Sequence, residues 1–428
     1  MEGDRHVRHV LGTVFVCVLL MLQAASPAQG QQAVAALADA VAFALEHNPQ
    51  VAASRAVVRA AEAQVQAVRA GLAPTVSLSA GGSLGNSTGS PTTSGQVSAG
   101  VTYLIYDGGL REAQIRQAEA QAESGRQALA AVITDVALQT VQAYMGVIVA
   151  DQVILLREQA VTLARTQLAA AEANFRAGRV ARADVIRAES VLAAADYDLV
   201  NARGQAETSR TTLRTAMGLE GGGPLTVTAP AEPPPQEISE ADALQRALQR
   251  PEVRRAEADV RAAEAGLAMA MIQGGVTVTL DGRYVLIGTG GTGTSASGTW
   301  SVGVGITIPL SDGGRRAAQV EAARANLDAS RARLESLRFL VRQEALLTRL
   351  QVATAIAKLE AARRSALAAR EAFNVAQGRY AAGVGTIVEV TTAQTDLAAA
   401  EVALVQAAAD RWTTTVGLRR AVALAVLP

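Results

Sequence analysis

Four stretches of the chain alternate apolar and polar residues with a period of two, which predicts β-strands. One pair spans Thr75–Leu84 and Gln96–Tyr106, and the other begins near Val276 and ends with Trp300–Leu310. Strict alternation gives each strand one apolar face and one face of small or polar residues. Each stretch has roughly ten residues, the length that a tilted membrane-spanning strand needs. The same pattern also fits a soluble sheet whose apolar face covers a core.

Helical periodicity dominates the rest of the chain. Helices are predicted over Leu37–Ala70 and Glu240–Ile272, and Pro49 and Pro251 are expected to kink or interrupt them near their starts. The chain has 50% hydrophobic but only 3% aromatic residues, and alanine is abundant. Alanine favours helix but buries little surface, so this composition predicts long, closely spaced helices rather than one thick core.

Two long helical hairpins are predicted. The helical pattern is unbroken from Gly109 to Phe175 and from Gly314 to Tyr380, and each segment would form a rod of about 100 Å. Turns at Gly178 and Gly383 start return helices with heptad seams, which predicts coiled-coil packing. The seam residues are Val185, Ala188, Leu192, Ala195, Leu199, Ala202, Ala206, Ser209, Leu213 and Ala216, then Val390, Ala393, Leu397, Ala400, Leu404, Ala407, Thr414 and Leu418, with Arg411 as an interruption.

The chain is an internal duplication. Arg59–Ala63 reads the same as Arg261–Ala265 at an offset of 202 residues, and Asp107–Gly109 matches Asp312–Gly314 at an offset of 205. Between the copies, Gly221–Pro235 is too rich in glycine and proline to be helical. Matches at this order and spacing indicate that one structural unit is repeated.

The N-terminal segment has the composition of a secretory signal, with Arg5 and Arg8 before an apolar run from Val10 to Leu22. Cys17, the one cysteine, lies in that run, so a mature chain would have no disulfide. No later segment is expected to form a helix that crosses a bilayer. The predicted organisation is a signal peptide at 1–30, a first repeat at 31–218 with a β-hairpin at 74–106 and a helical hairpin at 109–217, a linker at 219–238 with a short strand at Leu225–Val227, and a second repeat at 239–428 with a β-hairpin at 276–311 and a helical hairpin at 314–424.

The four predicted strands cannot close a barrel by themselves. Open edges in lipid would leave backbone groups unpaired, at several kcal/mol each, so several copies must share one barrel. Two copies would give a filled eight-stranded barrel, and three would give twelve strands around a lumen. The polar segments Gly85–Gly95 and Gly288–Gly298 are expected to form long loops at one rim.

Charge and motifs exclude several function classes. Thirty-nine acidic residues balance thirty-nine basic ones, which argues against a nucleic-acid partner. His47 is the one histidine beyond the N-terminal segment, and the chain lacks a zinc spacing, a nucleophile elbow and a phosphate loop. We therefore expect no enzyme activity, no catalytic residue, no cofactor and no metal site.

Two sets of motifs resemble a known family. Tyr106–Gly109 and Ser311–Gly314 repeat an Asp-Gly-Gly element, and the turns at Phe175–Val185 and Tyr380–Val390 are more specific. Across nearly the whole mature chain the sequence resembles the TolC-like outer membrane efflux proteins. The resemblance implies a membrane hybrid of helices and β-barrel. Three identical chains would form a twelve-stranded barrel in the bacterial outer membrane, and the duplicated long helical hairpins would form an α-barrel across the periplasm.

The resemblance also implies function and site residues. The protein would be a passive exit duct of a tripartite efflux or type I secretion system, docking a periplasmic adaptor (membrane fusion protein) and, through it, an inner-membrane transporter. Asp184, Tyr380 and Glu389 match a periplasmic gate, whereas Gly385 and Thr392 replace a basic and an acidic gate residue of the family. The residues that match the adaptor-docking tip are Gly178, Arg179, Gly383, Val384 and Gly385.

Soberer interpretations stay open at this point. A glycine at a helical turn is often a simple C-cap, and an acid such as Asp184 near a helix start compensates the helix dipole. The chain as a whole could instead be a periplasmic coiled-coil adaptor or a structural envelope tether. Two hairpins and four strands arranged by duplication favour the duct, since an adaptor carries one hairpin between β-rich domains. The cargo is not encoded in any recognisable motif.

Overall fold

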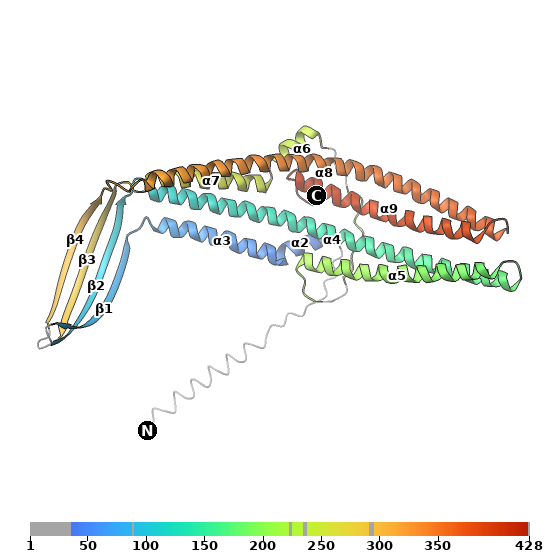
Figure 1. Ribbon diagram of the computed structural model, residues 1–428, viewed down its shortest axis with the longest axis horizontal. Coiled ribbons are helices and arrows are strands. Elements are labelled where there is room, and N and C mark those ends of the chain that lie inside the picture. Colours follow the sequence, from blue (N-terminus) through green and yellow to red (C-terminus); the bar gives the residue numbers. More distant parts are fainter. Residues whose placement is uncertain (1–35, 88–89, 222–224, 234–237, 291–294, 427–428) are drawn as a thin grey trace, which may run out of the picture.

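The computed structural model describes residues 36–87, 90–221, 225–233, 238–290 and 295–426. The molecule is a long rod with a four-stranded sheet at one end and the turns of two helical hairpins at the other (Figure 1). The predicted signal peptide, with Cys17, lies outside the described residues. The fold is the predicted hybrid of long helices and a small antiparallel sheet.

Two units with the same order of elements make up the rod. The first unit contains α2 (Leu37–His47), α3 (Pro49–Ala70), β1 (Thr75–Ser87), β2 (Ser90–Tyr106), α4 (Leu110–Arg176) and α5 (Arg182–Met217). The second unit contains α6 (Glu240–Ala247), α7 (Pro251–Ile272), β3 (Thr277–Gly290), β4 (Ser295–Thr307), α8 (Arg315–Ala381) and α9 (Ile387–Ala421). Helices α4 and α8 have 67 residues each, and α3 and α7 have 22 each. The residues of α4 and α8 therefore correspond one to one, and so do those of α3 and α7.

Each early proline divides a predicted helix into two. Pro49 and Pro251 are the first residues of α3 and α7, where a missing N–H costs nothing because that group has no partner within the helix. The Asn48 side chain caps α3 by accepting a hydrogen bond from the backbone N of Gln50 at 2.8 Å. The interruption was predicted, and its form is a restart of the helix.

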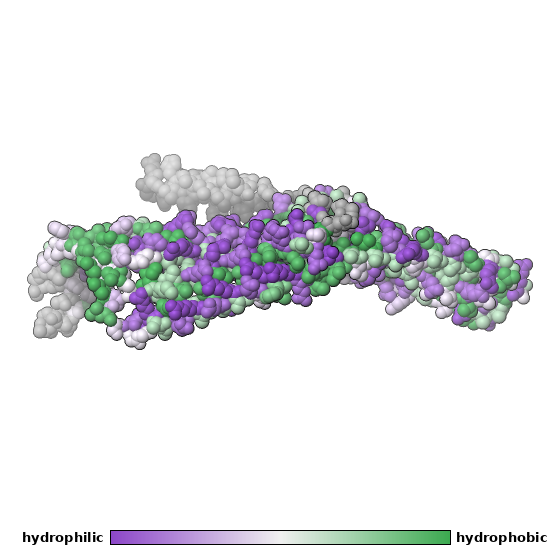
Figure 2. All heavy atoms as spheres, turned by 90° about the horizontal axis from the view of Figure 1, so that it is seen from above, coloured by the Kyte–Doolittle hydropathy of each residue, from purple (hydrophilic) through white to green (hydrophobic). Residues whose placement is uncertain are grey.

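The sheet has the order β1-β2-β3-β4, with every neighbouring pair antiparallel. Its register places Leu78, Ala99, Tyr284 and Trp300 in one row across all four strands. The alternating apolar residues thus share one continuous face, and Leu78, Tyr284 and Trp300 are exposed on it. Figure 2 shows hydrophobic residues gathered over this end of the rod.

The expected long loops between paired strands are wrong. Strands β1 and β2 continue to Ser87 and from Ser90, and β3 and β4 continue to Gly290 and from Ser295. The sequence from Gly85 to Gly95 is small or polar apart from Pro91, so no apolar alternation marks the strand there. Backbone pairing continues nevertheless, and the Ser83 and Ser94 hydroxyls lie 2.7 Å apart across it.

The long helices pair as the heptad seams predicted. Helix α4 packs along α5, and α8 packs along α9. All the predicted seam residues of α5 and α9 are buried or half-buried. Alanines such as Ala188, Ala202 and Ala206 are among the most buried residues of α5, and their small side chains allow close helix approach.

An equatorial core holds the middle of the rod together. It joins α2, α3, α4, α5, α9 and the segment between the units, with Tyr144 and Val141 of α4 fully buried. The Tyr144 hydroxyl donates to the Thr228 carbonyl at 2.7 Å and accepts from its N–H at 3.1 Å. The strand predicted at Leu225–Val227 is wrong, because this segment lies against helices and pairs with no strand among the described residues.

Helix α4 differs from the prediction in one more respect. Among the described helices it alone is long enough and apolar enough to pass a length-and-composition test for a membrane span. Its apolar stretch packs in the equatorial core, for instance through Val136, Val141 and Val147. Burial in a core gives a helix the same composition as burial in lipid.

Candidate functional site: hairpin tips, gate and equator

The Asp-Gly-Gly elements connect the sheet to the long helices. The Asp107 carboxylate accepts from the backbone N of Gly109 at 3.1 Å and of Arg111 at 3.0 Å, and Gly108 and Gly109 have φ of +69° and +90°. Burial alone would raise the pKa of Asp107, but these hydrogen bonds and the Arg111 guanidinium hold it below its ordinary value. Asp312 repeats the arrangement at the start of α8. The motif is therefore a cap that turns the chain from strand into helix.

The two hairpin tips lie at the end of the rod farthest from the sheet (Figure 1). Gly178 and Gly383 have φ of +68° and +73°, which is the glycine-favouring conformation of a helix C-terminus. The backbone N of Arg179 donates to the Asn174 carbonyl at 2.9 Å, and that of Val384 donates to the Arg379 carbonyl at 3.0 Å. Gly178, Arg179, Gly383 and Val384 are exposed. Backbone hydrogen bonds close the turns, and these four residues lie on their surface.

Gly385 is enclosed by the turn that it follows. Its N–H donates to the Arg379 carbonyl at 3.0 Å, and a Cβ built on it would lie 3.0 Å from the backbone N of Tyr380 and 3.1 Å from the carbonyl carbon of Arg379. Backbone atoms cannot move aside cheaply. The basic side chain expected from the family at this position therefore does not fit the observed turn.

The acidic gate candidates occupy equivalent places in the two units. Asp184 lies in the first turn of α5 and Glu389 in the first turn of α9. The Thr386 hydroxyl accepts from the backbone N of Glu389 at 3.3 Å, half of a capping box, and Arg379 approaches the Glu389 carboxylate at 3.8 Å. Glu389 thus has a structural role as well as a half-exposed charge.

Tyr380 is packed between the two hairpins. Its ring lies in a cluster with Phe373 of α8, Val390 of α9 and Leu163 of α4. Its hydroxyl is buried without a hydrogen-bond partner among the described residues. The structure therefore does not join Tyr380 to Asp184 within one chain.

An ion-pair cluster, which the sequence analysis missed, joins the two units at the equator. Arg420 of α9 donates to Asp135 of α4 at 2.7 Å, to Glu344 of α8 at 2.9 Å and to Glu252 of α7 at 3.1 Å. Buried Arg250 adds a bidentate contact to Glu252 and a 2.5 Å contact to Glu344. A possible signal was the placing of charged residues on both sides of Pro251. We call these five residues the equatorial ion cluster.

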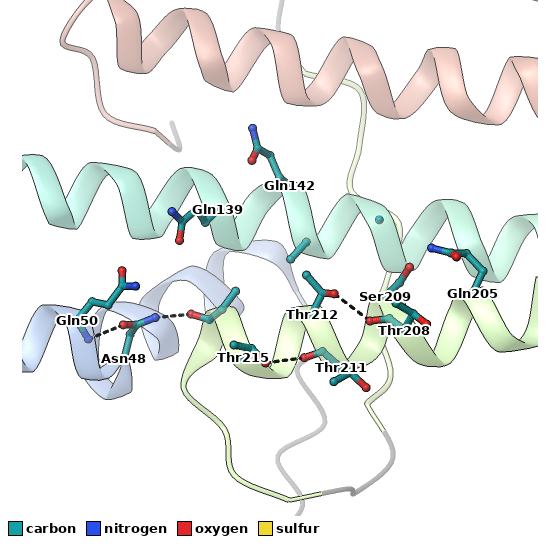
Figure 3. Close-up of a pocket in the computed structure, with 13 residues that line it drawn as sticks. Asn48, Gln50, Gln139, Gln142, Gln205, Thr208, Ser209, Thr211, Thr212 and Thr215 are labelled. Carbon is teal, nitrogen blue, oxygen red and sulfur yellow. Dashed lines mark hydrogen bonds between the residues drawn. The ribbon is translucent and has the colours of Figure 1, made fainter.

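A polar pocket of about 630 Å³ occupies the equivalent place in the first unit. Figure 3 shows Asn48 and Gln50 at its α2–α3 end, Gln139 on α4 and the threonines of α5 along its wall. Thr212 and Thr215 donate their hydroxyl hydrogens to carbonyls one turn earlier, at 2.9 and 3.0 Å. This equatorial pocket is uncharged. Within the described chain, no group of three His, Cys, Asp or Glu side chains could hold a metal ion.

The model of the outer membrane efflux protein family matches residues 40–219 and 243–424. The chain belongs to this family. Each unit of this efflux-family chain is therefore one copy of the family's repeat. The family comprises outer-membrane channel and transport proteins, and its members are trimeric channels of tripartite efflux systems. The chain is an outer-membrane channel protein, with its sheet at the membrane and its helices in the periplasm.

Individual relatives agree with the family match. Protein CyaE of Bordetella pertussis is 30% identical over 387 residues, which cover 84% of this chain and 78% of that protein. Outer membrane efflux protein BepC of Brucella suis is 29% identical over 389 residues, covering 87% and 82%. The crystal structure of the Campylobacter jejuni CmeC outer membrane channel has a TM-score of 0.77 at 18% identity, covering 90% of this chain and 85% of that one. The predicted fold class and location are thereby confirmed.

Proposed function

We propose that three copies of this channel protein form a homotrimer whose twelve strands close a barrel in outer-membrane lipid. The observation that carries the proposal is the sheet, in which β1 and β4 are edge strands and one face is continuously apolar. Lipid does not satisfy the backbone groups of an open edge, whereas β1 of a neighbouring copy would pair with β4. Three copies leave a lumen, and two would not.

The assembly is tested with the full chain purified from membranes. In mild detergent we expect the mass of three chains, and in planar bilayers we expect stepwise ion conductance. A protein that stays monomeric and water-soluble without detergent, or never conducts, would overturn the proposal.

We further propose that the hairpin tips dock a periplasmic adaptor, through which the duct receives cargo from an inner-membrane transporter. A partner would find an exposed surface closed by backbone hydrogen bonds, made of Gly178, Arg179, Gly383 and Val384 with enclosed Gly385 behind them. A photoreactive residue at Val384 should capture a periplasmic adaptor in cells. The matched control is Val375, which is also exposed but lies earlier on α8. Equal capture at both positions would remove the tip from the proposal.

The periplasmic gate is proposed to lie just above these tips, at Asp184, Tyr380 and Glu389. The Tyr380 hydroxyl is buried without a hydrogen-bond partner in the described chain, and a buried unpaired hydroxyl of this kind supports a role beyond packing. Tyr380→Phe keeps the ring packing but removes this hydroxyl, so we expect normal trimers with a higher resting conductance. Unchanged conductance in Tyr380→Phe would exclude Tyr380 from the gate.

A further inference from the structure

Helix α4 of the first unit packs on the second unit, but α8, the equivalent helix of the second unit, has no such neighbour beyond its own unit within one described chain. Helix α4 packs against α7 and α9 of the second unit, whereas α8, its equivalent, packs against α6, α7 and α9 of its own unit. One edge of the protomer carries α8 and β4, and the opposite edge carries α3, α5 and β1 (Figure 1). A heterologous contact between identical copies that closes into a ring would bring these two edges together.

The outward face of α8 is apolar and exposed. Phe339, Leu340 and Leu350 are 67%, 57% and 58% exposed. Position 350 corresponds to Met145 of α4 at the offset of 205, and Met145 is only 5% exposed. A position that α4 buries inside the chain is thus exposed on α8.

The equatorial ion cluster of the second unit and the equatorial pocket of the first unit occupy equivalent positions in the repeat. Arg420 corresponds to Thr215 and Glu344 to Gln139 at the offset of 205, while Glu252 corresponds to Gln50 at the offset of 202. The partner of Arg420 across the unit boundary, Asp135, corresponds to Leu340. The positions that would meet, Thr215 and Leu340, are therefore both uncharged where the ion cluster has Arg420 and Asp135.

A second pair changes in the same concerted way. Ser124 of α4 donates to Asp259 of α7 at 2.6 Å across the unit boundary. The corresponding residues are Ala329 on α8 and Val57 on α3, and both are exposed. A polar contact inside the chain corresponds to an apolar pair at the two edges.

A third pair keeps its charges. Glu123 of α4 and Arg261 of α7 line one groove between these helices. Hydrogen bonds from Gln127 and Arg126 lower the pKa of Glu123, and the charge of Arg261 adds to this lowering. The corresponding residues are Asp328 on α8 and Arg59 on α3, which carry the same signs. Both are exposed, and no ion pair joins either to another residue of the described chain.

We infer that α8 of a second copy of this chain docks along α3 and α5, with its Leu340 over the equatorial pocket beside Thr215 and its Asp328 beside Arg59. The inference rests on the proposed homotrimer and names the faces that meet in it. Leucine suits the pocket wall because the hydroxyls of Thr212 and Thr215 donate to carbonyls of their own helix, which leaves the threonine methyl groups for apolar contact. An arginine at position 215 would face Leu340 instead of an acid, and an unpaired charge at such a joint is costly.

The test is cross-linking of the full chain in membranes. Arg420 reaches Asp135 through a long side chain, so we expect the Cα atoms at the equivalent positions 215 and 340 to lie beyond the range of a disulfide. A short bismaleimide is therefore the suitable reagent. In Thr215→Cys with Leu340→Cys, every copy carries both thiols, so we expect covalent dimers and trimers on denaturing gels. Neither single variant should give them.

The matched control is Thr215→Cys with Leu367→Cys. Leu367 is similarly exposed on α8, but it lies roughly 40 Å farther along the helix, and this pair should stay monomeric on the gel. The inference is overturned if the two pairs link equally, or if Thr215–Leu340 stays unlinked in membranes that conduct. In the latter case the proposed trimeric channel survives, whereas loss of conductance and of native trimers together would count against the proposed function.

Charge reversal supplies an independent measurement. Asp328→Arg alone places two cations together at the joint, and we expect the trimer to dissociate at a lower temperature on semi-native gels. Adding Arg59→Asp restores opposite charges and should recover most of the loss. If the double variant is no better than the sum of the single ones, the two residues do not meet.

Discussion

Arg420 of α9 donates from Nε to the Asp135 carboxylate of α4 at 2.7 Å, and the same guanidinium reaches Glu252 and Glu344. One side chain thereby joins α4, α7, α8 and α9. The charges lie beside the equatorial core, where water screens them less than at the surface.

Removing this guanidinium should loosen the two units of one chain from each other. Arg420→Gln leaves three acids near one another, and we expect a loss of about 2 kcal/mol of stability. The measurement is thermal unfolding of the detergent-solubilised protein by circular dichroism. Exposed Arg364 provides the control, and Arg364→Gln should unfold like the parent protein. Similar losses of stability in both variants would show that the cluster contributes no more than an exposed arginine.

Acid should weaken the same cluster. Burial alone would raise the pKa of Glu252, but the hydrogen bonds and charges of Arg250 and Arg420 hold it below its ordinary value. The stabilisation is therefore complete above the ordinary glutamate value of about 4.3 and is lost as the pH falls through the lowered pKa. The melting temperature should fall less between neutral and acidic pH in Glu252→Gln than in the parent. An identical fall in both would contradict the assignment.

Restoring a side chain at Gly385 should damage the α8–α9 turn. A Cβ there meets the backbone of Arg379 and Tyr380, so we expect Gly385→Ala to raise protease cleavage at this tip and Gly385→Arg to raise it at least as much. Val180 holds the equivalent position in the first unit, and Val180→Ala is the control. A well-behaved, protease-resistant Gly385→Arg would show that the turn adapts.

The charge of Glu389 should set an ionic preference at the proposed gate. Three copies around one axis would favour cations, so Glu389→Gln should shift the single-channel reversal potential toward neutrality in a salt gradient. Thr386→Ala weakens the helix cap but keeps the charge, and it should leave the potential unchanged. A shift in Thr386→Ala alone would point to a structural origin.

Periodic features of the fold could be predicted from the sequence, because each pattern occurs in both repeats. The seams of α5 and α9 and the proline breaks follow from local chemistry. The ends of the strands could not be predicted, since the sequence from Gly85 to Gly95 has no apolar alternation and only cross-strand pairing marks it as β.

The candidate site divides in the same way. The glycine turns at Gly178 and Gly383 have local signatures, so the tips could be located. The enclosure of Gly385 and the meeting of Asp135 with Arg420 depend on segments distant in sequence, and a single sequence does not show which charges become neighbours. The gate residues stay predictions, because the structure describes one chain.

The two equatorial sites respond to different conditions. Salt and acid weaken the ion pairs of Arg420, which join the two units of one chain. The pocket at Thr215 and Gln139 has no ionisable side chain, so neither condition changes its charge. A duct crossing a compartment exposed to the outside medium would thus become softer within each subunit in acid, while its subunits stay together at this level.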